Sequence, residues 1–349
     1  MQIYENELYK EDLKHCGNLP IDWELFRDKS ILVTGATGMI GSFLIDVLMT
    51  KNLNCKIYAV GRNVKKAQQR FAPHWGNDGF CFVEADINKG ISVNVGKIDY
   101  MIHGASNTHP IAYAEDPIGT VATNVIGTYN FLELAVEKNV KRVAFLSTVE
   151  VYGENRGDCE YFTEDYCGYI DCNTMRAGYP ESKRAGEALC QAYIKQKSLD
   201  FVIPRLPRTY GPTMQMSDSK AIAQFIKKGI IKENVVLKSD GTQLYSYCHV
   251  LDSVSGILWC LTEGVCGEAY NIASKESDIQ MKDLAKIIAD YSGTEVVFDI
   301  PEATEQAGYS KATKALMDSS KLKKLGWKAI YNMELGLKNT IDILANIEK

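Results

Sequence analysis

A short apolar segment followed by three regularly spaced glycines is the feature that most constrains the fold of this chain. Ile31, Leu32 and Val33 precede the glycines, and an apolar helical segment follows them at 42–49. This order predicts a buried parallel strand, a tight turn and a helix. Glycine suits the turn because a Cβ would hold the backbone N–H groups away from a pyrophosphate, which binds at the helix N-terminus. The residues expected to contact a dinucleotide here are Gly35, Thr37, Gly38, Met39, Ile40 and Gly41.

Strands and helices alternate along the chain after this turn. A long helical pattern covers residues 117–139. Alternation of this kind predicts an α/β fold with a Rossmann-type, doubly wound parallel sheet. Residues 1–29 precede the first strand and form an N-terminal arm, which we expect to cover the domain or to reach a partner subunit. The further segments with strand character are 56–62, 82–87, 100–106 and 142–148.

The end of the second predicted strand bears on the choice of cofactor. Gly61 and Arg62 stand about 20 residues beyond the glycine turn, where a dinucleotide fold meets the adenosine ribose. An acidic residue there would bind the ribose hydroxyls and repel a 2′-phosphate. Arg62 instead suits that phosphate, and Lys65, Lys66 and Arg70 add positive charge, although a solvated helix face is an equal alternative for the lysines. We therefore expect NADP(H) to be favoured over NAD(H).

Small and polar residues at later strand ends complete the predicted cofactor site. Asp86 suits an adenine amino group, and Gly104 and Ala105 let a cofactor lie across the strand end. The neighbouring His103 is interpreted as a buried core histidine. The remaining residues assigned to this site are Ile87, Asn124, Tyr179 and Lys183.

The reactive groups follow the fifth predicted strand. Thr148 and Glu150 place a hydroxyl and a carboxylate at its carboxyl end, where ligands bind in open α/β sheets. Pro180 is tolerated only in the first turn of a helix, so Tyr179 starts a helix and Lys183 lies one turn later on the same face. A phenol with a pKa of about 10 is a weak base at neutral pH. We expect the Lys183 ammonium to lower the pKa of Tyr179.

The order of the motifs supports a family resemblance. The motifs are Gly-x-x-Gly-x-x-Gly, Asp-Ile, Asn-x-x-Gly-Thr, Ser-Thr-x-Glu-Val-Tyr-Gly, Tyr-x-x-x-Lys and Arg-x-x-x-x-Tyr-Gly-Pro. Together they resemble the extended short-chain dehydrogenase/reductases, the NAD(P)-dependent nucleotide-sugar epimerase/dehydratase family, from about Ser30 to Ala345. This resemblance implies a dinucleotide-binding Rossmann domain at 30–211. It also implies a smaller C-terminal substrate-binding lobe at 212–349, with segments near 246–273 returning to the Rossmann domain.

The resemblance also implies roles for individual residues. Tyr179 would take a proton from a sugar hydroxyl as hydride passes to nicotinamide, and Lys183 would hold the nicotinamide ribose. Thr148 would bind the reacting oxygen. Glu150 occupies the position that holds a carboxylate beside the sugar in the dehydratase and decarboxylase branches. The residues assigned to substrate binding are Ser106, Thr148, Arg208 and Tyr245.

Three departures from the family pattern bear on the reaction. Val149 stands where a dehydratase acting on thymidine-linked glucose has an acidic residue that protonates the leaving hydroxyl. Tyr245 stands where epimerases and decarboxylases usually carry an arginine for the substrate diphosphate. Arg208 replaces a common asparagine and is expected either to supply part of the lost charge or to form a structural ion pair.

These features lead to a ranked set of functions for a nucleotide-sugar enzyme that works through a keto intermediate. Epimerisation ranks first, and an NADPH-dependent ketoreductase ranks second because of Arg62 and Tyr245. Dehydration or decarboxylation ranks third, since Glu150 favours it while Val149 and Tyr245 oppose it. A catalytically silent dinucleotide-binding scaffold is the alternative from a different class.

Composition and the family resemblance set the expected partners. The net charge of −5 and the pI of about 5.7 argue against a nucleic-acid partner. No signal sequence is visible at 1–14, and no apolar run approaches the roughly 20 residues that span a bilayer, so we expect a cytoplasmic protein with no membrane partner. The ten scattered cysteines predict neither disulfides nor a metal site. The resemblance implies a homodimer through helices at 118–138 and 180–197, with Leu132, Val136, Leu189 and Tyr193 on the interface.

Overall fold

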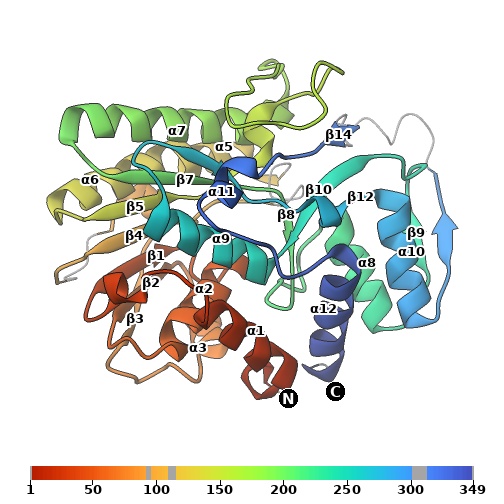
Figure 1. Cartoon of the computed structure of the whole chain (residues 1–349), viewed down its shortest axis with the longest axis horizontal. Coiled ribbons are helices and arrows are strands. Elements are labelled where there is room, and N and C mark those ends of the chain that lie inside the picture. The colour runs from red at the N-terminus through yellow and green to blue at the C-terminus, as the bar shows by residue number, and fades with distance from the viewer. Residues whose placement is uncertain (1, 92–95, 109–114, 301–312, 348–349) are drawn as a thin grey trace.

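The protein has a large parallel sheet at one end and a smaller group of short strands and helices at the other (Figure 1). The computed structural model describes residues 2–91, 96–108, 115–300 and 313–347. In these parts of the chain no helix combines the length and the apolar character that a membrane span requires.

The large sheet is wound in both directions from its first strand. Every pairing in it is parallel, and the short β6 (Ser147–Thr148) pairs with β7 beside the main path. The predicted doubly wound Rossmann-type sheet is therefore confirmed. Across the sheet the strands are β3 (Phe80–Glu84), β2 (Lys56–Gly61), β1 (Ser30–Thr34), β4 (Tyr100–His103), β5 (Arg142–Phe145), β7 (Phe201–Leu206) and β11 (Ala269–Asn271).

Each face of this sheet has its own apolar core because strand side chains alternate between the two faces. In β1, Ile31 and Val33 belong to one core and Leu32 to the other. The first face is covered by α1 (Glu7–Gly17), α2 (Met39–Thr50) and α9 (Val250–Glu263), with α3 (Val64–Arg70) near the β3 edge. The opposite face carries α5 (Pro117–Ala122), α6 (Thr128–Glu137) and α7 (Gly178–Lys197).

The smaller group packs around a separate core that includes Phe225, Leu284 and Leu337. Its strand β10 ends next to α9, which returns the chain to the large sheet before β11. The boundaries proposed for the two domains stay a prediction. The strands of this group are β8 (Arg208–Tyr210), β9 (Val235–Leu237), β10 (Leu244–His249), β12 (Asp278–Gln280), β13 (Val296–Phe298) and β14 (Lys314–Ala315), and its helices are α8 (Ala221–Ile230), α10 (Met281–Ser292) and α12 (Met333–Ile347). The short helix α11 (Ser320–Lys324) instead packs on α9 and β11 of the large sheet.

The N-terminal arm is tied to the large sheet through a buried carboxylate on α2. Both oxygens of Asp46 are used: the hydroxyls of Tyr4 and Tyr9 donate to it, and so does the Arg70 guanidinium at 2.5 Å. His74 Nε2 lies 3.0 Å from the same group. Burial raises the pKa of Asp46, but the Arg70 charge and the hydrogen bonds outweigh burial and hold that pKa below its ordinary value.

We expect Asp46→Asn to lower the free energy of unfolding by about 3 kcal/mol at neutral pH, because it leaves a buried guanidinium without its counter-ion. The contribution of Asp46 is complete above the ordinary carboxyl pKa of about 4 and is lost as the pH falls through the lowered pKa of the folded state. Urea unfolding at pH 7 and at pH 3 measures both effects.

The matched control is Glu24→Gln, which breaks an exposed ion pair with Arg27. This variant should lose much less stability than Asp46→Asn. Equal losses in the two variants would contradict the role given to Asp46.

Candidate active site

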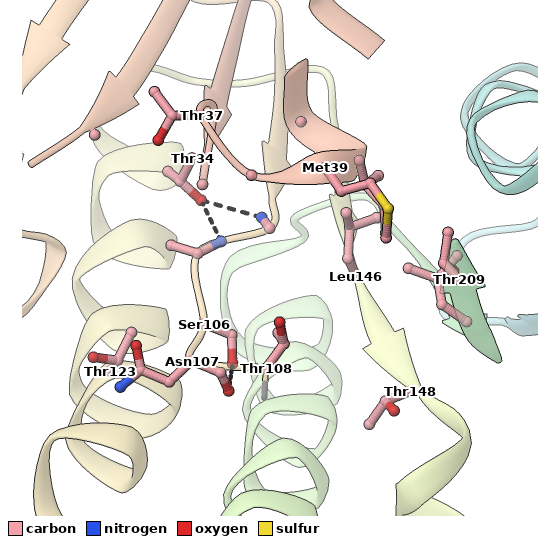
Figure 2. A pocket seen from close by; sticks show the side chains of 18 of the residues that line it. Thr34, Thr37, Met39, Ser106, Asn107, Thr108, Thr123, Leu146, Thr148 and Thr209 are labelled. Carbon is pink, nitrogen blue, oxygen red and sulfur yellow. Dashed lines mark hydrogen bonds between the residues drawn. The ribbon is translucent and has the colours of Figure 1, made fainter. Parts of the chain in front are cut away.

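A cavity of about 460 Å³ lies at the carboxyl ends of the parallel strands. This is the place where open α/β sheets bind ligands. The glycine turn forms part of its wall. In Figure 2, Ser106, Asn107, Thr108 and Thr123 lie on one side of the pocket, and Leu146, Thr148 and Thr209 lie on the other.

The glycine turn lies close against the end of β4. Gly35 has a φ of +69°, and a Cβ on it would come within 2.5 Å of the Gly104 carbonyl oxygen. A Cβ on Gly41 would come equally close to the Gly35 carbonyl oxygen. The Thr34 hydroxyl accepts hydrogen bonds from the amides of Gly104 and Ala105, both at 3.2 Å (Figure 2). The turn can therefore pack this closely on β4 and on α2 only because these positions lack side chains. The helix α2 begins directly after it at Met39, which gives the turn the helix N-terminus that suits an anion.

The other predicted cofactor residues divide into two groups. Arg62, Asp86 and Ile87 line the cavity, and Asp86 also caps the following turn by accepting the Asn88 amide at 3.1 Å. Asn124 is buried behind the wall, in the π-helical turn η4 (Thr123–Gly127).

Asn124 is held by partners on both sides. It accepts the Ser106 hydroxyl at 2.7 Å and donates to the Ser182 hydroxyl at 2.9 Å. In this structure Asn124 therefore supports the cavity from behind, with Ser106 on the surface.

The start of α7 brings Tyr179 and Lys183 to the cavity. The Lys183 ammonium donates to the Leu146 carbonyl oxygen at 2.8 Å, and burial lowers the pKa of Lys183 to about 8. Burial also raises the pKa of Tyr179 well above its ordinary range, and the Glu150 carboxylate raises it further, whereas the Thr148 hydrogen bond lowers it. The expectation that Lys183 lowers the pKa of this phenol is not met, because loss of hydration is the largest effect on it.

Glu150 forms an ion pair with Arg176, which the sequence analysis did not predict. Glu150 lies in η5 (Val149–Tyr152) and lines the cavity. Both of its carboxylate oxygens accept hydrogen bonds from Nη2 of Arg176, at 2.8 and 2.7 Å. The only signal in the sequence was an unexplained arginine three residues before Tyr179.

The two unusual residues at the expected diphosphate site contact each other. The Arg208 guanidinium lies over the Tyr245 ring, with 3.5 Å between its Cζ and the ring centroid. Arg208 lines the cavity, whereas Tyr245 is buried beneath it. Nη1 of Arg208 is also buried, and no described residue accepts a hydrogen bond from it. The arginine is therefore held at the cavity wall by a ring contact.

His103 is a buried core residue, which confirms the interpretation drawn from the sequence. Its Nδ1 lies 2.8 Å from the Thr34 hydroxyl and its Nε2 lies 3.0 Å from the Thr128 hydroxyl. Burial lowers the pKa of His103 well below its ordinary value, and the Lys183 charge lowers it further. The neutral ring supports Thr34 from below.

A segment after β8 also reaches the glycine turn. The Thr213 hydroxyl donates to the Met39 carbonyl oxygen at 2.9 Å, and the Gln215 amide donates to the Thr37 carbonyl oxygen at 3.3 Å. These contacts join residues more than 170 positions apart. No local sequence pattern could have indicated them.

Comparisons with known proteins agree with this geometry. The model of the NAD dependent epimerase/dehydratase family matches residues 31–273. The chain belongs to this family. UDP-glucuronic acid decarboxylase 1 of Xenopus tropicalis is 32% identical over 90% of this chain and 71% of its own length. UDP-glucuronic acid decarboxylase 6 of Arabidopsis thaliana is 33% identical over 88% of this chain and 86% of its own length.

The fold is shared with solved structures of the family. UDP-glucuronic acid 4-epimerase from Bacillus cereus, in complex with UDP-glucuronic acid and NAD, superimposes with a TM-score of 0.77 at 24% identity. The match covers 91% of this chain and 99% of that one. Membership of this family means that the chain is an enzyme that modifies nucleotide sugars.

The expectation that NADP(H) is favoured is wrong. The family is NAD dependent, and the similar epimerase structure holds NAD. Arg62 does line the cavity. A guanidinium can also stack on an aromatic ring, however, so its charge alone does not indicate a 2′-phosphate.

We expect Gly35→Ala to reduce NAD affinity about tenfold or more, because the added methyl group would push the turn away from Gly104 and misplace its N–H groups. Isothermal titration with NAD measures this. Gly76→Ala is the matched control, since Gly76 also has a positive φ, of +87°, but has no atom within 4 Å of the added Cβ.

Both variants should lose about 1 kcal/mol of stability from the unfavourable φ, and Gly35→Ala should lose more because its Cβ also meets the Gly104 backbone. Only Gly35→Ala should lose affinity for NAD. Wild-type affinity in Gly35→Ala would contradict the role of the turn.

Proposed function

We propose that this enzyme removes carbon dioxide from a UDP-linked uronic acid through a keto intermediate. The observation that carries the proposal is Glu150, which lines the cavity beside Tyr179 in a chain similar to UDP-glucuronic acid decarboxylases over most of its length. The carboxyl group of a uronic acid is attached to sugar carbon 5. Its loss as carbon dioxide needs a ketone on the adjacent carbon 4 to take up the electron pair, and oxidation of the hydroxyl at carbon 4 provides that ketone.

Each residue has a defined task in this proposal. Tyr179 receives the proton of the carbon 4 hydroxyl in its phenolate form, which the positive charge of a bound nicotinamide would favour, and Thr148 binds the same oxygen. Lys183, buried and fixed by the Leu146 carbonyl, holds the nicotinamide ribose. Bound NAD would accept hydride from carbon 4 and return it at the end of the cycle. Glu150 relays the proton that carbon 5 takes up when carbon dioxide leaves.

The ranking drawn from the sequence alone changes accordingly. Decarboxylation moves ahead of epimerisation because of the relatives. The ketoreductase function is no longer supported by Arg62, because the expected preference for NADP(H) is wrong. Val149 still opposes dehydration, since an apolar side chain lines the cavity where an acid is needed. The objection based on Tyr245 weakens, because Arg208 lies over the Tyr245 ring at the cavity wall and could supply a cation for the diphosphate.

Incubation of the purified protein with NAD and UDP-glucuronic acid should give a product lighter by one carbon dioxide, detected by mass spectrometry. Unchanged mass with a new sugar isomer would indicate epimerisation instead, and loss of water would indicate dehydration. Either result would refute the proposal.

Two variants test the assigned residues in the same assay. Tyr179→Phe should cut turnover by roughly 10²-fold or more while NAD affinity stays nearly unchanged, since only the acid/base is lost. Glu150→Gln should also stop release of carbon dioxide but leave slow reduction of NAD detectable. Near-normal turnover of Tyr179→Phe would contradict the mechanism.

We also propose a homodimer formed through α5, η4 and α6. Exposed apolar side chains there support an interface, and Ile118 is 83% exposed. The interface residues expected from the sequence need correction at Leu132, which is fully buried within the protomer, and at Tyr193, which is buried and donates to Glu133. The exposed apolar residues of this surface are Ile118, Val121, Ile126 and Tyr129.

Light scattering at micromolar concentration should give the mass of a dimer, and Ile118→Asp should shift it toward the monomer because a charge would be buried in the interface. Ile231→Asp is the control, as Ile231 is also exposed but follows α8 in the smaller group. A monomeric unmodified protein would refute the dimer.

A further inference from the structure

We propose that Arg176 selects substrates with a carboxylate on the reacting sugar, by exchanging Glu150 for that carboxylate when the substrate binds. This inference rests on the proposed function and adds to it the residue that recognises the group to be removed. Arg176 acts in binding, whereas Tyr179, Thr148 and Glu150 act on the reacting atoms.

Glu150 lines the cavity, and Arg176 pairs with it from outside the cavity lining. The Arg176 side chain is 43% exposed and the Glu150 side chain is 26% exposed, so an entering ligand can reach both. Both hydrogen bonds of the pair come from the single nitrogen Nη2. The guanidinium presents its N–H donors in a planar fork, which is a geometry suited to binding a carboxylate.

The position of Arg176 is fixed relative to the phenol. Arg176 lies in the short helix η6 (Met175–Ala177), which runs directly into α7 and its Tyr179. The charge of Glu150 raises the pKa of Tyr179 and the charge of Arg176 lowers it, so both side chains lie within electrostatic reach of the phenol oxygen. A substituent on carbon 5 is the neighbour of the hydroxyl that Tyr179 contacts. That substituent therefore comes close to this ion pair.

Charge explains why the exchange selects a uronic acid. A substrate carboxylate placed beside Glu150 would be repelled unless a cation pairs with it in place of Glu150. Arg176 is that cation. A neutral hydroxymethyl group on the same carbon could not replace Glu150 and would leave the ion pair closed. The exchange also releases the oxygens of Glu150 from the guanidinium, which makes them available for proton transfer.

The test compares the affinities of the protein with bound NAD for UDP-glucuronic acid and for UDP-glucose. We expect the unmodified protein to prefer UDP-glucuronic acid and Arg176→Gln to lose about tenfold or more of that preference, the scale of a charge-assisted hydrogen bond. Arg176→Lys should restore part of it. Arg156→Gln is the matched control, because it removes a comparable exposed ion pair, with Glu154, away from the cavity wall.

Two further readouts separate recognition from a structural role. In Arg176→Gln the KM for UDP-glucuronic acid should rise far more than kcat falls, because the contact is already present in the bound substrate. Glu150→Gln should keep or increase the preference for UDP-glucuronic acid even though turnover stops, since the substrate carboxylate no longer has to displace a competing anion from Arg176. A merely structural ion pair would make the two variants behave alike.

The inference is overturned if the unmodified protein shows no preference, if Arg176→Gln retains it, or if Glu150→Gln loses it. Release of carbon dioxide by the unmodified protein tests the proposed function separately. If no carbon dioxide appears, decarboxylation is refuted, and the affinity ratios still decide whether Arg176 recognises the carboxylate.

Discussion

The close approach of Gly35 to the backbone of Gly104 is the constraint on which the site depends. With no side chain between them, the turn after β1 rests against the end of β4, and Thr34 fixes both through its hydroxyl. The cavity opens at this point because the sheet is wound outward in opposite directions from β1 and β4. Tyr179 and Lys183 of α7 reach the same strand ends because that helix packs on the core of the opposite face of the sheet.

Two buried polar side chains of the site have partners on other elements. Asn124 joins Ser106 to Ser182, and Lys183 joins α7 to the strand end at Leu146. The irregular π-helical turn at 123–127 brings Asn124 into this position. Such turns often mark functional sites because they redirect a side chain without ending the helix.

Local sequence patterns were sufficient to predict the sheet, the glycine turn and the helix that carries Tyr179, since each depends on the spacing of neighbouring residues. Features that depend on the packing of distant segments could not be predicted in the same way. The pairing of Glu150 with Arg176 spans 26 residues and the stacking of Arg208 on Tyr245 spans two strands. The pKa of Tyr179 was misjudged because burial is a property of the whole fold. Arg62 was over-interpreted because one positive charge is compatible with more than one adenosine contact.

The hydrogen bonds from Thr213 and Gln215 change the polarity of the glycine turn. A tight turn exposes carbonyl oxygens as well as amide hydrogens, and the lone pairs of the oxygens repel a phosphate. Here the carbonyls of Thr37 and Met39 are occupied by donors from the segment after β8. Each of these carbonyl oxygens therefore already has a donor, which reduces its repulsion of a phosphate at the turn. The segment after β8 thus helps to make the turn suited to an anion, even though it contributes no glycine to it.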